Sequence, residues 1–255
     1  MILHSKIIGS GRPFLILHGF FGMGDNWKSL ANKFADNNYE VHLIDQRNHG
    51  RSFHSDDFNY QVMAEDVLQY CNAHQLTNVV LLGHSMGGKT AMTFAVNYPA
   101  FVSKLLVADI APKQYPQHHQ YILKGLSVIE ATNLQSRGEA DKILSAYIEE
   151  SGIRLFLLKN LYWKNKEELA LRINLSVLTE KIEEVGKPLQ DDGVFNGETM
   201  FFRGEKSNYI EDFDEVDIVK HFPNATLQTI SKAGHWLHAE NPQEFYTKVM
   251  DFLYL

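Results

Sequence analysis

The sequence has a single cysteine and no long apolar segment, and both absences exclude classes of protein. Cys71 cannot form an internal disulfide, so nothing in the chain requires an oxidising compartment. No stretch approaches the roughly 20 apolar residues that span a bilayer. The first residues, MILHSKIIGSGRP, lack the apolar run of a secretory signal. We therefore expect a cytoplasmic protein without stable membrane association.

Basic residues are neither abundant nor clustered along the chain. The sequence has 24 Lys and Arg against 31 Asp and Glu, a formal net charge of −7. This balance argues against a nucleic acid or an anionic membrane as the main partner. What the chain does have is 255 residues with 44% hydrophobic content, enough for one sizeable core and an additional insertion.

Short apolar runs alternate with helical patterns along most of the chain. Such runs are typical of strands buried on both faces of a parallel sheet, and the helices between them supply the crossovers. The sequence therefore predicts a doubly wound α/β fold with a mostly parallel sheet. The six expected strands lie at residues 14–17, 41–44, 78–82, 104–110, 199–202 and 226–230.

The alternation stops after the expected strand that ends near Ile110. From residue 113 to residue 190 helical patterns follow one another, with Leu, Ile and Val at intervals of three and four, and no strand run is evident. We expect residues 113–190 to be a helical cap inserted into a core made of residues 1–112 and 191–255.

A G-x-S-x-G motif, Gly83-His84-Ser85-Met86-Gly87, lies directly between an apolar run and an alanine-rich helical pattern. This order is typical of the nucleophile elbow of the α/β-hydrolase fold, in which serine occupies a strained turn and glycines avoid collisions with the tight backbone. The helix N-terminus beneath the serine favours developing negative charge. The pattern predicts Ser85 as a nucleophile rather than as part of a simple connecting turn.

An upstream apolar run ends in His18-Gly19-Phe20-Phe21-Gly22. In this fold one oxyanion donor is the backbone N–H after the nucleophile, here that of Met86, and the other comes from the loop after an earlier strand. We expect Phe20 to supply the second N–H. For His18 we favour a role in shaping the strand exit, because the loop needs its backbone more than the imidazole.

Near the C-terminus, Ala233-Gly234-His235 follows the last apolar run and precedes the final helical pattern. A general base that reaches a serine at the carboxyl edge of the sheet should lie on a loop at that edge, and His comes last in the chain order of this fold. The position predicts His235 as the base. His238 is the alternative, and we favour a structural role for it near the helix start.

The usual place for the triad acid holds no acid in this chain. That place is a Gly-x-x-Asp turn after the strand that follows the cap, and counting from Gly204 leads to Ser207. Either a nearby residue supplies the carboxylate or the acid has moved to another strand. The nearby candidates are Glu205, Glu211 and Asp212.

Asp109, at the end of the strand after the nucleophile helix, is the preferred acid. A carboxylate within a run of Leu, Val and Ile is costly to bury unless it is paired, and protonated His235 would pair with it. In that position it would hold the His235 tautomer and stabilise the imidazolium. A turn or capping aspartate is the alternative.

Five segments together carry a family resemblance that covers nearly the whole chain. They are HGFFG with Asn26-Trp27, DQRNHGRS from Asp45 to Ser52, GHSMGGK from Gly83 to Lys89, DIAP from Asp109 to Pro112, and AGHWLHAENP from Ala233 to Pro242. They resemble the YbfF-like esterases and the related ABHD11-like branch of the α/β-hydrolases. The resemblance implies an esterase or acyl-transfer hydrolase with a helical cap, no metal and no organic cofactor, and an acid on the strand after the nucleophile helix, which matches Asp109. In DQRNHGRS we expect Arg47 and Asp45 to pair beneath the oxyanion loop.

These residues predict a serine esterase that acts on a small-molecule carboxylic ester, with a thioester as a further possibility. A C–C hydrolase, lyase or cofactor-free perhydrolase could use the same groups, because fold and triad do not determine the reaction. A noncatalytic binding protein would not be expected to keep nucleophile, base and oxyanion loop together. Substrate contacts are expected from Lys113 and Tyr115 at the cap entrance and from Trp236 beside the base, with a solvated Lys113 as the alternative.

Overall fold

A seven-stranded sheet crosses the molecule in the order β1-β3-β2-β4-β5-β8-β9. The computed structural model describes residues 1–117, 119–166 and 168–254. Every neighbouring pair in the sheet is parallel except β1 with β3. The strands are β1 (Ser5–Ile8), β2 (Arg12–Leu17), β3 (Tyr39–Ile44), β4 (Val79–His84), β5 (Val102–Ala108), β8 (Glu198–Gly204) and β9 (Ala225–Ile230).

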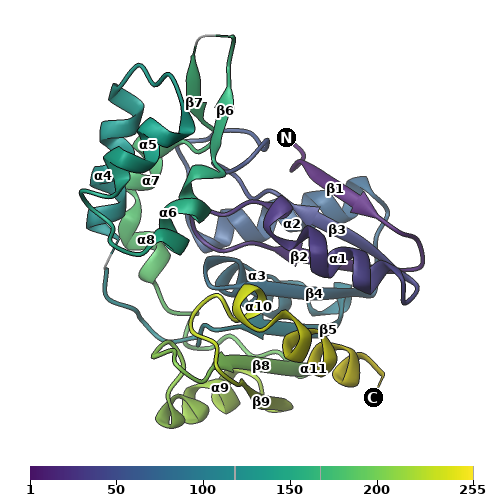
Figure 1. The fold of residues 1–255 in the computed structure, drawn as a ribbon. Helices are drawn as coiled ribbons and strands as arrows, with labels where there is room; N and C mark the ends of the chain where they lie inside the picture. The colour runs from purple at the N-terminus through teal and green to yellow at the C-terminus, as the bar shows by residue number, and fades with distance from the viewer. Residues whose placement is uncertain (118, 167, 255) are drawn as a thin grey trace.

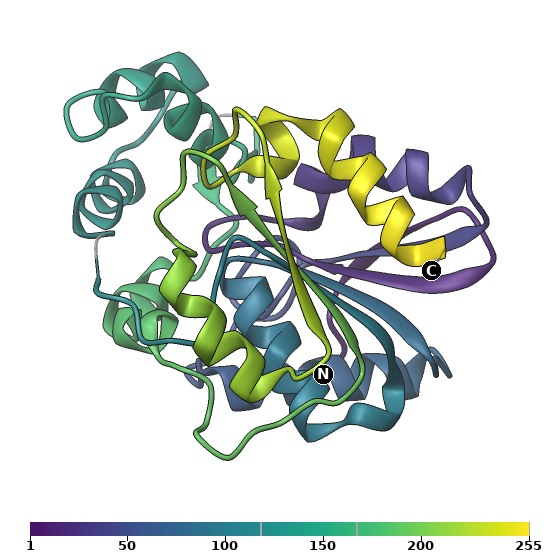
Figure 2. The same cartoon turned by 90° about the horizontal axis from the view of Figure 1, so that it is seen from below.

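Helices cover both faces of the sheet, and each face has its own apolar core (Figures 1 and 2). On one face, α2 (Tyr60–Ala73), α3 (Met86–Asn97) and α9 (Glu215–His221) pack on the strands. On the other lie α1 (Lys28–Ala35) and α11 (Pro242–Tyr254), with the short α10 (Leu237–Glu240) before α11. Strands β2 and β4 are buried along most of their length because they lie in the middle of these three layers.

The chain between β5 and β8 forms a separate group of helices at one end of the sheet (Figure 1). A third apolar cluster fills this group and includes Phe20, Phe58 and Met86 from the sheet end beneath it. The insertion is therefore packed onto the core by apolar contact. Its elements are α4 (Gln120–Ala131), α5 (Arg137–Leu144), α6 (Ser151–Leu158), β6 (Leu161–Trp163), β7 (Leu169–Leu171), α7 (Leu175–Glu180) and α8 (Ile182–Gly186).

All six strands expected from the sequence are present, and the doubly wound, mostly parallel fold is confirmed. The strand expected to end near Ile110 ends at Ala108, because Asp109 adopts a φ of 52° that turns the chain out of the sheet. The edge strand β1 was not expected. It is only four residues long, and its mixed burial leaves little apolar pattern to detect.

The expectation of no strand within residues 113–190 was wrong. Strands β6 and β7 form an antiparallel hairpin, closed by a hydrogen bond from Lys164 N–H to Glu168 O at 2.9 Å. Each strand has three residues, which is too short to produce an alternating pattern. In the part of the chain that the structure describes, no helix combines the length and apolar character needed to cross a membrane.

Candidate active site

Ser85 occupies a strained turn between the end of β4 and the start of α3. Its backbone has φ 52° and ψ −118°, a conformation that costs free energy for a residue with a side chain. The turn brings α3 close to β2, since a Cβ at Gly87 would lie 2.3 Å from the carbonyl oxygen of Leu17. Glycine is required at that position because backbone, not a movable side chain, fills the space.

The expected oxyanion donors lie beside Ser85. Phe20, Ser85 and Met86 all line one small cavity of about 30 Å³. Met86 is the first residue of α3, and the first N–H groups of a helix have no acceptor within it. The neighbouring Phe21, at φ 59°, donates its N–H to His49 Nε2 at 3.2 Å. The loop is thus held through the residue next to Phe20.

Asp109 and His235 are in contact although 126 positions separate them in the sequence. His235 Nδ1 lies 2.8 Å from Asp109 Oδ2, and the Asp109 side chain is fully buried. Two further groups donate to the same carboxylate: Gly204 N–H to Oδ1 at 2.9 Å, and the Ser207 hydroxyl to Oδ2. Three donors satisfy a carboxylate that would otherwise be very costly to bury.

Ser207, which stands where the sequence pattern placed an acid, is therefore a hydrogen-bond donor to the acid on the neighbouring strand. The sequence alone does not predict this contact. The sequence does place Asp109 and Ser207 just after the strands β5 and β8. Whether these two strands are neighbours depends on the order of strands in the sheet, which the sequence pattern does not give.

The three alternative acids have other partners. Glu205 accepts the Lys232 N–H at 2.6 Å, and Asp212 pairs with Arg203 at 2.5 Å. Glu211 precedes the short 3₁₀ turn η3 (Asp212–Asp214), and its main-chain N–H donates to the Asp214 carboxylate at 2.8 Å. Among the described residues, the carboxylate that contacts His235 is that of Asp109.

The loop that carries His235 is held by two further aromatic side chains. The Tyr209 ring stacks on the His235 imidazole, with centroids 3.9 Å apart and planes 20° from parallel. His84 donates a ring N–H to the carbonyl oxygen of His235 at 2.8 Å. Burial, together with His238 and His235 nearby, lowers the pKa of His84 well below its ordinary value, so His84 is a neutral donor.

His238 occupies a different setting from His235. It is buried and stacks face to face on Trp27, with centroids 3.9 Å apart. Burial lowers its pKa to about 3, and none of the described carboxylates forms an ion pair with it. These features favour the structural role expected for His238.

A larger cavity of about 280 Å³ opens between Ser85 and the insertion. Its lining joins Ser85 and His235 with apolar side chains from α4 and α6, which supply Ile122 and Phe156 among others. Trp236 also lines this cavity, with its ring 5.9 Å from that of Phe156. Ser85 therefore faces a cavity whose lining is mainly apolar.

The two residues expected at the cap entrance differ in their placement. Tyr115 lines the small cavity, and its hydroxyl donates to Tyr209 O at 2.6 Å while accepting the Ala111 N–H at 2.8 Å. Lys113 lines neither cavity, and its ammonium lies 2.6 Å from a carboxylate oxygen of Asp214. The structure thus brings Tyr115 and Trp236 to the site, and places Lys113 in an ion pair.

Two buried histidines support the oxyanion loop from below. His18 Nε2 accepts the Gln46 N–H at 3.0 Å, and His49 Nε2 accepts the Phe21 N–H. Each donates its other ring nitrogen to a carbonyl oxygen, of Gly19 and Arg47 respectively. Burial lowers the pKa of His18 to about 4 and that of His49 to about 3, so both remain neutral and can accept.

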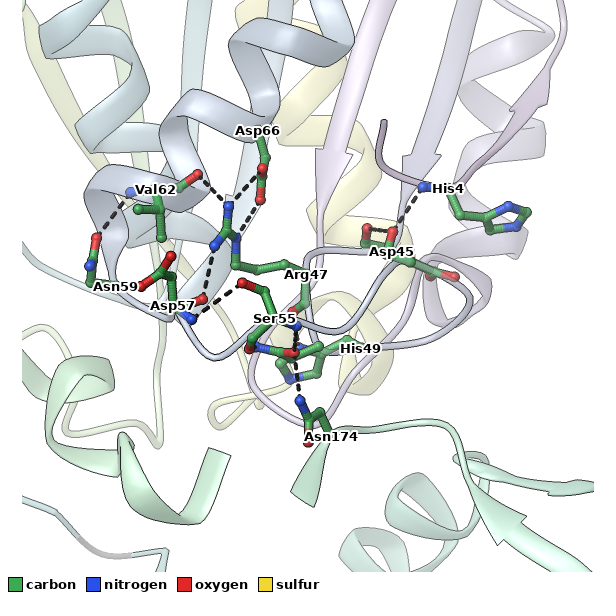
Figure 3. A network of polar contacts seen from close by, with 12 residues as sticks. His4, Asp45, Arg47, His49, Ser55, Asp57, Asn59, Val62, Asp66 and Asn174 are labelled. Carbon is green, nitrogen blue, oxygen red and sulfur yellow. Dashed lines mark hydrogen bonds and ion pairs between the residues drawn. The ribbon is translucent and has the colours of Figure 1, made fainter. Parts of the chain in front are cut away.

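Arg47 anchors the loop that contains His49 (Figure 3). Its guanidinium forms a bidentate pair with Asp66 on α2, at 2.6 and 2.8 Å, and donates to Asp57 O at 2.8 Å. The expected pairing of Arg47 with Asp45 was wrong. Asp45 instead accepts main-chain N–H groups, including that of Gly24 at 2.7 Å, and Arg47 points to the opposite side, toward α2.

Lys89, on α3, joins the two ends of the insertion. Its side chain is buried and donates to Lys113 O at 2.5 Å and Lys187 O at 2.9 Å, and it lies 5.2 Å from the centroid of the Tyr115 ring. These carbonyls belong to the two segments that connect the insertion with the sheet. Burial, with a smaller contribution from the Lys113 charge, lowers the Lys89 pKa to about 7.

The sheet order, the strained serine after β4 and the buried carboxylate bonded to a histidine define the α/β-hydrolase class. A family model described as alpha/beta hydrolase fold matches residues 12–127. The chain is 36% identical over 246 residues to the mouse protein named sn-1-specific diacylglycerol lipase ABHD11, covering 94% of this chain and 80% of that protein. It is 30% identical over 242 residues to Esterase YbfF of Escherichia coli, covering 94% and 92%. The chain therefore belongs to the α/β-hydrolase family, in its YbfF-like and ABHD11-like branch.

Solved structures agree with this assignment. A structure titled marine microorganism esterase superposes with a TM-score of 0.95 at 42% sequence identity, covering 99% of both chains. The E-2-(acetamidomethylene)succinate hydrolase structure has a TM-score of 0.80 at 18% identity, covering 99% of this chain and 95% of that one, and shares the fold.

Replacement of Arg47 by methionine should destabilise the protein by about 3–5 kcal/mol, because it leaves the Asp66 carboxylate buried without its partner. Urea unfolding measures the loss. The double variant Arg47→Met/Asp66→Leu should recover part of it, since neither charge remains. A single variant as stable as the parent would show that this pair does not anchor the loop.

The Lys89 pKa predicts a pH-dependent contribution to stability. Because the folded pKa is about 7 and the ordinary value is 10.5, the folded state binds fewer protons than the unfolded state between these pH values. The stability of the parent protein relative to Lys89→Met should therefore increase as the pH rises through this window. Thermal melting of both proteins in parallel measures the difference, and curves with a constant offset across the window would contradict the assignment.

Proposed function

We propose that this protein is a serine esterase that forms an acyl-enzyme on Ser85, with His235 as general base and Asp109 as triad acid. The observation that carries the proposal is the 2.8 Å contact of His235 with a fully buried Asp109, in a cavity that Ser85 also lines. The names of the related esterases and lipases support an ester as the substrate.

In the proposed first step, His235 Nε2 takes the Ser85 proton as Oγ attacks the ester carbonyl carbon. The oxyanion forms against the N–H groups of Phe20 and Met86, and the loss of one such donor typically costs about 2.7–4 kcal/mol. The imidazolium then protonates the departing alcohol, which leaves the acyl group on Ser85. Water, activated by the same imidazole, releases the carboxylic acid and restores the serine.

Asp109 holds His235 in the tautomer that the proposed reaction steps require. With Nδ1–H directed at Asp109, Nε2 is the atom that can accept the serine proton. Gly204 and Ser207 donate to the same carboxylate and hold it in place beside the imidazole ring.

The larger cavity is the proposed acyl site. Its apolar lining from α4 and α6 suits an aliphatic or aromatic acyl group, and its volume of about 280 Å³ limits the length of that group. Residues 113–190 would act as the cap that shapes this wall, on the core of residues 1–112 and 191–255. The smaller cavity beside Tyr115 leaves room for a small leaving group, and a thioester would react by the same steps.

Ser85→Ala should abolish hydrolysis of p-nitrophenyl esters, with a loss of about 10⁴-fold or more in kcat, because no other group can carry the acyl intermediate. It should also abolish labelling by a fluorophosphonate. The measurement compares the parent with the variant over a series of acyl chain lengths and over oxygen and sulfur leaving groups. Full activity in the variant would overturn the proposal, as would an unlabelled, inactive parent.

Asp109→Asn should lower kcat by about 10³–10⁴-fold with a small effect on KM, since the asparagine neither favours the required tautomer nor stabilises the imidazolium. Glu205→Gln and Asp212→Asn are the matched controls, because each removes one carboxylate near the same strand end. Both should retain activity close to that of the parent. A severe loss in either control together with an active Asp109→Asn would reassign the acid.

A further inference from the structure

A second sizeable cavity, of about 320 Å³, lies at the seam between the core and the insertion. It shares no lining residue with the two cavities around Ser85. One wall comes from the core, from β1 and the loop after β3, and the opposite wall comes from α5 and the β6–β7 hairpin. Figure 1 shows β1 and the hairpin on the same side of the molecule.

The cavity is strongly basic although the chain as a whole is acidic. Two of its lysine and arginine side chains come from the core and three from the insertion: Lys6, Arg51, Arg137, Lys159 and Arg172. The carboxylates in the lining are Asp25 and Asp45. Basic residues that are scattered along the sequence thus gather in one place in the fold.

The two carboxylates neutralise only part of this charge. Asp45 directs both oxygens at main-chain N–H groups, of Gly24 at 2.7 Å and Arg51 at 2.9 Å. Asp25 lies 4.0 Å from the Arg51 guanidinium. Among the described residues, no carboxylate lies within 4.0 Å of the charged nitrogens of the four other cations.

Two of the cations are held in place by neighbouring groups. Arg137 donates to Leu158 O at 2.5 Å and Leu161 O at 2.6 Å. The Arg172 guanidinium lies 4.3 Å from the centroid of the Tyr162 ring. Like charges that line one cavity repel one another, and an anion bound among them reduces that repulsion.

From this arrangement we propose that the cavity binds a phosphate-bearing anion that bridges the core and the insertion. Guanidinium groups match the oxygens of phosphate in a bidentate way, and the two lysines, one on each wall, add point charges. The volume exceeds that of one phosphate group, and Tyr162 and Trp163 give one side an aromatic surface, which suits the organic part of a phosphate ester. The ligand is either a soluble organic phosphate or the phosphate of a lipid headgroup.

Isothermal titration of the full-length protein with inorganic pyrophosphate tests the site. Saturable binding with one ligand per chain is expected, and it should weaken as sodium chloride is added, because the attraction is electrostatic. Lys159→Glu and Arg172→Glu should each weaken binding by about tenfold or more. Lys142→Glu is the matched control, since Lys142 is an exposed lysine of α5 outside the lining, and it should bind nearly as tightly as the parent.

Co-sedimentation with vesicles separates the two sources of phosphate. Vesicles of phosphatidylglycerol are compared with vesicles of phosphatidylcholine, for the parent and for Lys159→Glu. Saturable pyrophosphate binding without sedimentation supports a soluble ligand, and sedimentation with phosphatidylglycerol that Lys159→Glu abolishes supports a headgroup. No binding in either arm, or an equal loss in Lys142→Glu, overturns the proposal. Circular dichroism verifies that each variant is folded, and none of these readouts depends on ester hydrolysis.

Discussion

The buried carboxylate of Asp109 is the constraint around which the site is arranged. A carboxylate without solvent must be surrounded by donors, and here they come from Gly204 and Ser207 at the end of β8 and from His235 after β9. One side chain therefore ties together the carboxyl ends of three neighbouring strands. Because β4 lies next to β5, the same edge brings Ser85 into the cavity that His235 lines. The arrangement of the candidate site thus follows from the need to satisfy one buried charge.

Buried histidines complete the support of this edge without adding charge. His18, His49 and His84 have pKa values lowered by burial, and each uses its ring nitrogens to hold main-chain groups of the loops around Ser85. A neutral imidazole can accept one hydrogen bond and donate another, which suits loops whose N–H and C=O groups would otherwise be buried without partners. These three imidazoles thus serve as structural groups. His235 differs from His18, His49 and His84 because it contacts a carboxylate.

Local features of the site were predictable from the sequence, whereas its long-range contacts were not. Ser85 and its glycines lie in one short motif, and the six main strands have apolar runs of their own. Asp109 was preferred as the acid because Ser207 stands at the usual acid position, although Glu205, Glu211 and Asp212 stayed open as alternatives. The donation from Ser207 to Asp109, the stacking of Tyr209 on His235 and the pairing of Arg47 with Asp66 depend on which elements become neighbours. No periodicity encodes these contacts, and the incorrect pairing of Arg47 with Asp45 shows the limit of arguing from sequence proximity.

Two sets of hydrogen bonds connect the insertion with the loops and the helix around Ser85. At the base of the insertion, Lys89 donates to both connecting segments from α3, the helix that begins at the proposed oxyanion donor Met86. The insertion and the turn at Ser85 therefore share one supporting helix. Farther along, Asn160 donates to the carbonyl oxygen of Phe21 at 2.8 Å, next to the proposed donor Phe20. Lys159, which lines the basic cavity, is the residue immediately before Asn160. The basic cavity and the contact that holds the loop of Phe20 and Phe21 are therefore one residue apart in the chain.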